Sequence, residues 1–380
     1  MHIAVIGAGM IGAAAARHLA LAGHRVTLVG AAEPADRIAH DGPFASHYDS
    51  GRITRQMDPS PFWSRASRAS IARYRGLEAE TGVPFFSEVG SLMTAPGEHP
   101  DTARCRAVLT RDALPCSVLD TAEMGARFPA YACPEGFTGF HEPSLAGMID
   151  PREMVRAQII AARSHGATLI RDVVIGVDET AQATRIALRD GAPFEADRAL
   201  IATGGFTRAL TGAALPLTTM GRTVVLFEVT EAEVARLGPL PTLISLWRGG
   251  EDFYLLPPLR YPDGRLYVKL GGDPADMPLE VADMTEWFRS DGDAGVARYL
   301  KGLMAQIMPG LNVTATRTLP CVTTYMPSDL PAIGALSDRV FTAVAGCGRG
   351  AKNSDELGRL AGLLVSGKAL PDWAAGPLGL

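Results

Sequence analysis

Three glycines near the start of the chain have the spacing that brings a backbone close to a phosphate. Gly7, Gly9 and Gly12 form a G-x-G-x-x-G pattern within Gly7-Ala8-Gly9-Met10-Ile11-Gly12. The first glycine permits a tight turn, the second lets the backbone approach a pyrophosphate, and the third allows a helix to pack closely on a sheet. The pyrophosphate then lies at the positive end of that helix. The pattern alone is weak evidence, so its surroundings decide its meaning.

The segments around this turn predict a strand, a helix and a second strand. His2–Ile6 is an apolar run typical of a buried parallel strand, an alanine-rich helix follows the glycines, and Arg25–Val29 is the second strand. This context favours a dinucleotide cradle over an ordinary strand-to-helix turn. The acidic residue that usually ends the second strand and binds a ribose hydroxyl is replaced by Gly30. Glu33, three residues later, is the candidate substitute.

Two later glycine-rich turns help to distinguish FAD from NAD, which share the first turn. Ala202-Thr203-Gly204-Gly205 follows a predicted strand, and Gly346-Cys347-Gly348-Arg349-Gly350 precedes the last predicted helix. Both supply backbone that a ligand can approach closely. The N-terminus of a helix also stabilises negative charge on a reduced flavin ring. These turns therefore favour FAD.

Four cations have positions that suit an anion-binding or redox site. Arg52 and Arg55 lie three residues apart in a polar loop and could flank a carboxylate. Lys269 lies in a predicted strand and could stabilise developing superoxide charge. Lys352 lies in the first turn of the last helix, where the helix dipole disfavours a cation unless an anion is bound. A plainer alternative exists for each, because all four positions also suit solvated surface charges.

Composition excludes several classes of protein. The chain has 380 residues, of which 47% are hydrophobic, and a length of this order predicts about two to three domains. Its 36 basic and 41 acidic residues give a formal net charge of −5, which argues against a nucleic-acid surface. The apolar stretch 3–16 is too short to span a bilayer. We therefore expect a cytoplasmic protein with no nucleic-acid or membrane partner.

The five cysteines form no C-x-x-C pair, and their number is odd. A zinc knuckle or a secreted disulfide framework therefore does not fit, and a reducing compartment does. The histidines have no metal-ligand spacing, so we expect no metal site. The cysteines are interpreted as buried thiols, with Cys321 discussed below: Cys105, Cys116, Cys133, Cys321 and Cys347.

The chain alternates between parallel-sheet segments and strand-rich inserts, which predicts an α/β protein with a second α+β domain. Predicted helices cover 62–82, 151–165, 294–307 and 354–365, and a βαβ-like return contains strands at 168–170, 185–188 and 199–202. The nucleotide-binding domain is predicted from 1–85, 145–220 and 321–380, and the second domain from 86–144 and 221–320.

Together these segments resemble the D-amino-acid-oxidase-like family of flavoproteins, and within it the group of monomeric sarcosine oxidase and N-methyltryptophan oxidase. The resemblance covers almost the whole chain. It implies a Rossmann-like FAD-binding domain of the glutathione-reductase type with an antiparallel-sheet substrate domain. The motifs that carry it are Gly7–Gly12, the loop Ser46-His47-Tyr48-Asp49-Ser50-Gly51-Arg52-Ile53-Thr54-Arg55, Lys269-Leu270-Gly271, Cys321-Val322-Thr323-Thr324 and Gly348-Arg349-Gly350-Ala351-Lys352.

The resemblance also implies a role for individual residues. Arg52 matches an arginine against the flavin ring, Lys269 a lysine that activates O2 through water, and Tyr254 an active-site tyrosine. Cys321 matches the cysteine that is joined covalently to the flavin 8α-methyl group. The residues expected to contact FAD are Gly7, Gly9, Met10, Ile11, Gly12, Glu33, Ser46, Arg52, Gly204, Cys321, Gly348, Gly350 and Lys352.

The expected substrate site departs from the family pattern. Arg55 and Lys352 match the pair that binds the substrate carboxylate. Asp273 stands where sarcosine oxidase has a histidine, Thr323 replaces a tyrosine, and Gly51 replaces a threonine. These changes enlarge or recharge the pocket, so sarcosine itself is disfavoured, and Asp273 is the candidate contact to a second cationic or hydroxyl group.

The resemblance implies a monomeric FAD-dependent amine oxidase. Its substrate would be a secondary amine, N-methyl or otherwise N-substituted, of an amino-acid-like compound, with an imine as product and O2 reduced to H2O2. A flavin dehydrogenase, or a cyclic imino-acid or opine oxidase with another acceptor, is the alternative. An NAD-binding protein is the more remote one, slightly favoured by Gly30.

Overall fold

Apolar runs from distant parts of the chain form one six-stranded sheet. The computed structural model describes residues 1–246 and 252–378, so 247–251 and 379–380 of the predicted domains lie outside it. The strand order is β19-β20-β13-β1-β2-β9, parallel except for β19. The strands are β1 (His2–Ile6), β2 (Arg25–Val29), β9 (Thr168–Ile170), β13 (Arg198–Ile201), β19 (Ala332–Ala335) and β20 (Val340–Val344).

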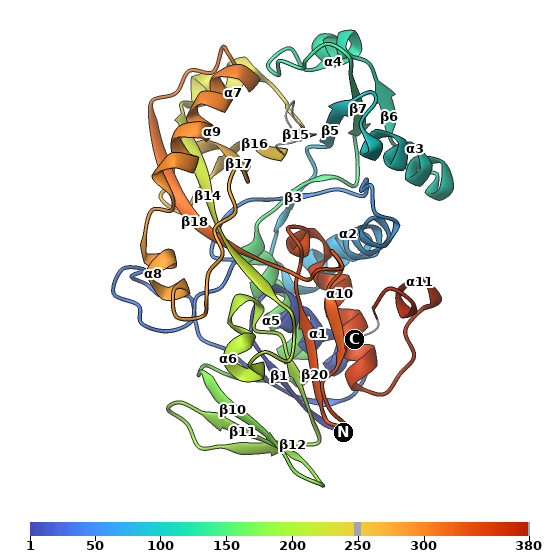
Figure 1. Ribbon diagram of the computed structural model, residues 1–380, viewed down its shortest axis with the longest axis vertical. Helices are drawn as coiled ribbons and strands as arrows, with labels where there is room; N and C mark the ends of the chain where they lie inside the picture. Colours follow the sequence, from blue (N-terminus) through green and yellow to red (C-terminus); the bar gives the residue numbers. More distant parts are fainter. Residues whose placement is uncertain (247–251, 379–380) are drawn as a thin grey trace.

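The strand-rich inserts form a second, eight-stranded sheet at the opposite end of the molecule (Figure 1). Its order is β18-β14-β17-β16-β15-β5-β7-β6, antiparallel except for the parallel pair of β15 and β5. The strands are β5 (Ser91–Pro96), β6 (Ser117–Leu119), β7 (Phe137–Glu142), β14 (Thr218–Val229), β15 (Thr242–Leu246), β16 (Asp252–Arg260), β17 (Leu266–Gly272) and β18 (Ala315–Tyr325).

Two small sheets complete the strands. One contains β10 (Val174–Glu179), β11 (Thr184–Leu188) and β12 (Phe194–Ala196), and the other contains β3 (Arg52–Thr54), β8 (Gly147–Ile149) and β4 (Phe86–Ser87). The prediction that 185–188 belongs to the parallel return was wrong, because this segment is β11 of an antiparallel sheet. Its alternating burial is that of a strand with one solvated face.

The helices largely match the predicted ranges. The segments predicted at 62–82, 151–165 and 294–307 form α2, α5 and α9, whereas the last long helix, α10, begins at Gly350. No helix in the described ranges is long and apolar enough to cross a bilayer. The helices are α1 (Met10–Leu21), α2 (Pro61–Thr81), α3 (Pro100–Asp112), α4 (Thr121–Arg127), α5 (Pro151–Ser164), the short η1 (Gly204–Phe206), α6 (Arg208–Thr211), α7 (Glu231–Leu237), α8 (Met284–Arg289), α9 (Ala294–Ile307), α10 (Gly350–Val365) and α11 (Asp372–Ala375).

The buried carboxylate of Asp355 forms hydrogen bonds to several of the helices that cover the six-stranded sheet. Helix α1 packs against α5 and α10, and α10 also packs on α2 (Figure 1). Asp355 on α10 is 1% exposed and accepts hydrogen bonds from Arg17 Nη2 of α1 at 2.5 Å and Gln158 Nε2 of α5 at 2.8 Å. Arg73 Nε of α2 donates to the other oxygen at 2.5 Å. Helix α10, which begins at the functional site, is thereby fixed.

Replacing Asp355 by Ala is expected to lower the free energy of unfolding by about 3–5 kcal/mol, because Arg17 then stays buried without its carboxylate. Chemical denaturation followed by tryptophan fluorescence measures this loss. Asp190→Ala is the control, since the Asp190 side chain is 75% exposed in its pair with Arg189. That variant should change stability by less than about 0.5 kcal/mol. Similar losses in both variants would contradict the role given to Asp355.

Candidate active site

The glycine-rich turns surround one long cavity of about 510 Å³. It extends from the turn after β1, along the loop 41–48, to the turn between β20 and α10. Such a volume is ordinary for a cofactor pocket. The expected FAD-contacting residues that line it are Gly7, Gly9, Met10, Ile11, Ser46, Arg52, Gly204, Cys321, Gly348 and Gly350.

The first turn has the backbone that a pyrophosphate cradle needs. Gly7 has φ +108°, a conformation that side chains disfavour, and its N–H donates to Val29 O at 2.7 Å. Helix α1 starts after Gly9, and no side chain caps its N-terminus. Its first N–H groups therefore remain available to an anion in the cavity.

The missing ribose-binding acid has a steric cause. A Cβ on Gly30 would lie 2.5 Å from Ala8 N, so the end of β2 approaches the glycine turn too closely for any side chain. The proposed substitute, Glu33, is absent from the residues that line the cavity and forms an ion pair with Arg152 at 2.7 Å. The structure thus does not bring Glu33 to the cavity.

The turn after β20 is strained in the same region. Ala345 and Cys347 have positive φ values of +69° and +46°, although neither is a glycine. Such conformations persist where the surroundings require them, often at functional sites. Helix α10 starts directly afterwards without a side-chain cap. Two uncapped helix N-termini and close-approach glycines around one cavity fit FAD, whose pyrophosphate and reduced ring both carry negative charge.

Arg52 and Cys321 meet at the wall of this cavity. Arg52 Nη2 donates to Ser46 O at 3.0 Å and lies 3.4 Å from Cys321 Sγ, while Nη1 pairs with the Asp49 carboxylate. The short strand β3 positions Arg52 by antiparallel pairing with β8. The arginine and the thiol are 269 residues apart in the sequence, and the fold brings them into contact at the cavity wall.

Lys269 is fully buried beside the same carboxylate. Its Nζ lies 2.5 Å from Asp49 Oδ2 and 2.7 Å from Gly51 O, and 5.8 Å from the centre of the Tyr254 ring. Burial and the nearby Arg52 guanidinium lower the pKa of Lys269 well below its usual value, and Cys321 opposes that shift. Tyr261 donates to the other oxygen of Asp49 at 2.8 Å. Asp49 thus holds the expected redox lysine in place.

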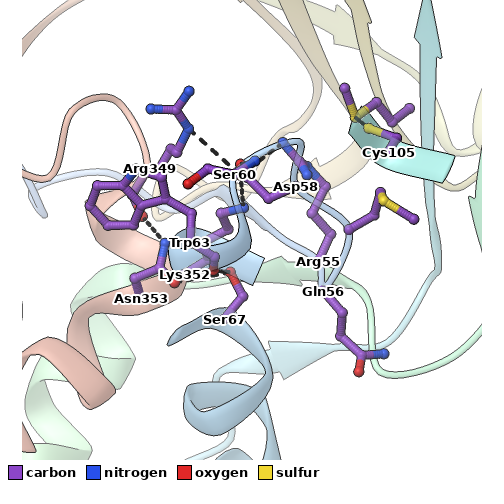
Figure 2. A network of polar contacts seen from close by, with 12 residues as sticks. Arg55, Gln56, Asp58, Ser60, Trp63, Ser67, Cys105, Arg349, Lys352 and Asn353 are labelled. Atoms are coloured by element: carbon purple, nitrogen blue, oxygen red, sulfur yellow. Dashed lines mark hydrogen bonds and ion pairs between the residues drawn. The ribbon is translucent and has the colours of Figure 1, made fainter. Parts of the chain in front are cut away.

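A second carboxylate, Asp58, joins the cations expected to bind substrate. Figure 2 shows Arg55, Lys352 and Arg349 converging on Asp58. Lys352 Nζ lies 2.8 Å from Asp58 Oδ2, and Arg55 Nη2 and Arg349 Nε each lie 3.6 Å from it. Burial lowers the pKa of Lys352 to about 8, although Asp58 counteracts this. The carboxylate of Asp58 is therefore the anion that stabilises a lysine at the positive end of helix α10.

Asp273 does not join either cluster. Its carboxylate is 44% exposed and lies 3.3 Å from Arg222 Nε. Burial raises the pKa of Asp273, and Arg222 opposes the shift. Within the described residues, no group of three or more His, Cys, Asp and Glu side chains is arranged to hold a metal.

Sequence reasoning missed the two carboxylates that organise the site. Asp49 and Arg52 are three residues apart, as are Arg55 and Asp58, and the signal was this repeated opposite-charge spacing. It was overlooked because the loop has no periodic pattern from which burial could be predicted. Arg349 was named only as part of a glycine-rich turn.

Comparison with known proteins identifies the family of this chain. Residues 2–363 match the family model described as FAD dependent oxidoreductase. Monomeric sarcosine oxidase of Bacillus sp. (strain B-0618) is 26% identical over 61% of this chain, and the match spans only 59% of that relative. N-methyl-L-tryptophan oxidase of Yersinia pestis (strain Pestoides F) is 21% identical over 97% of this chain and 95% of the relative.

Solved structures show the same fold. The open form of NikD, described as an unusual amino acid oxidase essential for nikkomycin biosynthesis, has a TM-score of 0.77 at 20% identity, covering 99% of this chain and 96% of NikD. L-proline dehydrogenase from P. horikoshii also has a TM-score of 0.77 at 20% identity, covering 98% and 95% of the two chains. Because the family model spans nearly the whole sequence, the protein belongs to the FAD dependent oxidoreductase family.

Proposed function

We propose that the protein is an FAD-dependent amine oxidase that converts a secondary amine of an amino-acid-like compound into an imine, with O2 reduced to H2O2. The observation that carries this proposal is the placement of two buried cation clusters beside one cofactor-sized cavity. Arg52 and Lys269 lie on Asp49 at the cavity, and Arg55 and Lys352 lie on Asp58 next to it.

The six-stranded sheet would hold the cofactor within a domain of the glutathione-reductase type, for which we propose the segments 1–85, 145–220 and 321–380. The free N–H groups of α1 would bind the pyrophosphate, and Arg52 would lie against the flavin ring. Bound FAD supplies an acceptor for the two electrons and the hydrogen that leave the carbon next to the amine nitrogen. The nitrogen loses its proton, so the organic product is an imine, which water hydrolyses.

Arg55 and Lys352 would orient the substrate by its carboxylate. Both side chains are buried, at 7% and 5% exposure, where a charge-assisted hydrogen bond to a carboxylate is stronger than in water. Holding the carboxylate at this place fixes the neighbouring C–H bond relative to the cavity, which is the main contribution of a positioning group to the rate.

Lys269 would stabilise the negative charge that develops when O2 is reduced. Its ammonium is engaged by Asp49 at 2.5 Å, so part of that positive charge is already neutralised. This ion pair specifically favours the second candidate function, a flavin dehydrogenase that passes its electrons to an acceptor other than O2.

The purified holoprotein should be yellow and release H2O2 with at least one amine from a screen of N-methyl, cyclic and sugar-modified amino acids. Peroxidase-coupled detection measures the product. The same screen with an artificial electron acceptor distinguishes the two candidates. Turnover with the artificial acceptor alone would select the dehydrogenase, and protein without flavin absorbance would contradict both.

Lys269→Met is expected to slow the reaction of the reduced enzyme with O2 by about a hundredfold, because the buried positive charge is lost. Anaerobic stopped-flow measurement should show a much smaller effect on flavin reduction by the amine. Asp49→Asn is the partner variant, since it removes the carboxylate that pairs with the buried Lys269 ammonium and should therefore also slow the oxygen reaction. Equal losses in both half-reactions, or no loss, would exclude this role for Lys269.

Cys321 is proposed as the covalent attachment point, since its Sγ lies in the cavity wall 3.4 Å from Arg52. Acid precipitation of the wild-type protein should leave yellow colour in the pellet, and Cys321→Ala should release it. Cys347→Ala is the matched control, because Cys347 also lines the cavity and should leave the attachment intact. Colour in the wild-type supernatant would refute the bond.

A further inference from the structure

Asp58 is an unusual neighbour for a carboxylate-binding site. Its side chain is 0% exposed, and one oxygen, Oδ2, faces the cations, while Oδ1 accepts the Ser60 N–H at 3.1 Å. Burial alone would raise the pKa of Asp58, but Lys352, Arg55 and Arg349 lower it to about 2. At neutral pH the protein therefore keeps one full carboxylate of its own among these cations (Figure 2).

Arg55 retains donors that this carboxylate does not satisfy. Asp58 lies 3.6 Å from Arg55 Nη2, beyond hydrogen-bond distance. The other terminal nitrogen, Nη1, is buried and has no hydrogen-bond partner among the described residues. Because a buried donor without an acceptor is costly, a 93%-buried guanidinium in this state indicates a ligand that supplies the acceptor.

The net charge around Arg55 and Lys352 determines how many negative charges a bound ligand can bring. Arg349 is also neutralised by Asp329, whose two oxygens each lie 2.9 Å from Arg349 Nη1. The carboxylate paired directly with the two buried cations Arg55 and Lys352 is that of Asp58, so these three side chains together carry a net charge of +1. Glu142 lies nearby, and burial raises its pKa, although the Gln56 and Met57 N–H groups that it accepts at 2.9 Å oppose the shift. The net charge of Arg55, Lys352 and Asp58 is therefore balanced by one further negative charge, and a second one is disfavoured.

We propose that Asp58 is a specificity-determining residue that permanently occupies one carboxylate position of the substrate site. The substrate then brings a single carboxylate, which binds the free Nη1 edge of Arg55, and amines with a second carboxylate close to the first are rejected. This inference deepens the proposed amine oxidation and rests on it, since it assigns a substrate class to the same site. It assigns monocarboxylate amines to the enzyme.

The site lies next to the cavity on two elements. Arg55 follows Arg52 by three residues, and Lys352 directly follows Ala351; both Arg52 and Ala351 line the cavity. Tyr74 anchors the second element by donating to Lys352 O at 2.9 Å. A carboxylate at Arg55 is thus held beside the cavity, and the visible spectrum of the bound flavin is a suitable reporter of its binding.

The experiment titrates acetate and malonate into the holoprotein and follows the flavin spectrum, with thermal unfolding as a second readout. Wild-type protein should bind acetate more tightly than malonate. Asp58→Asn adds one net positive charge and should raise the affinity for malonate relative to acetate by at least about tenfold. Glu231→Gln removes a 74%-exposed carboxylate that pairs with Arg260 outside this cluster, and it should change this ratio less than twofold.

Two further variants keep the test decisive if Asp58→Asn folds poorly. Asp58→Glu retains the charge and should retain the preference for acetate, whereas Arg55→Lys removes the Nη1 donor and should weaken acetate binding at least about tenfold. Tighter binding of malonate than acetate by the wild type, an unchanged ratio in Asp58→Asn, or no acetate binding at all would overturn the proposal. These readouts need no turnover, so they are independent of the amine screen that tests the proposed function.

Discussion

The whole candidate site depends on burying cations next to a cavity that must receive a large anion. An unpaired buried charge is far too costly for a protein of ordinary stability, so each cation needs an internal carboxylate. Asp49 forms ion pairs with Arg52 and Lys269. Asp58 forms them with Lys352, Arg55 and Arg349. Both acids lie in the loop that surrounds β3, which concentrates the electrostatic control in a short stretch of chain.

This arrangement explains why distant elements must be fixed so firmly. Lys269 comes from the eight-stranded sheet, whereas Lys352 comes from α10 beside the six-stranded sheet. Small displacements of either element would lengthen ion pairs of 2.5 and 2.8 Å and leave buried charges unmatched. The Asp355 contacts to three other helices restrain α10, and antiparallel pairing with β16 and β14 restrains β17.

The sequence predicts the framework better than the site. The G-x-G-x-x-G turn and the helix at 294–307 follow from local patterns, and the structure places both as predicted. The position of 185–188 was wrong because a short apolar run has the same composition in a parallel and an antiparallel sheet. The roles of Asp49 and Asp58 were missed although both lie three residues from an arginine, because burial of an irregular loop is decided by residues more than two hundred positions away.

Gly30 illustrates how packing can change ligand recognition without any change in chemistry. The end of β2 touches the glycine turn, so an acid at this position would collide with Ala8 before it reached a ribose. An acidic side chain at position 30 and the glycine turn that forms the pyrophosphate cradle would therefore occupy the same space, and this chain has the glycine turn without the acid. Affinity for the cofactor then depends more strongly on the two uncapped helices and on the cavity wall at Arg52 and Cys321. A tether at Cys321 would remove this dependence, because a covalently held cofactor needs no ribose contact to remain bound.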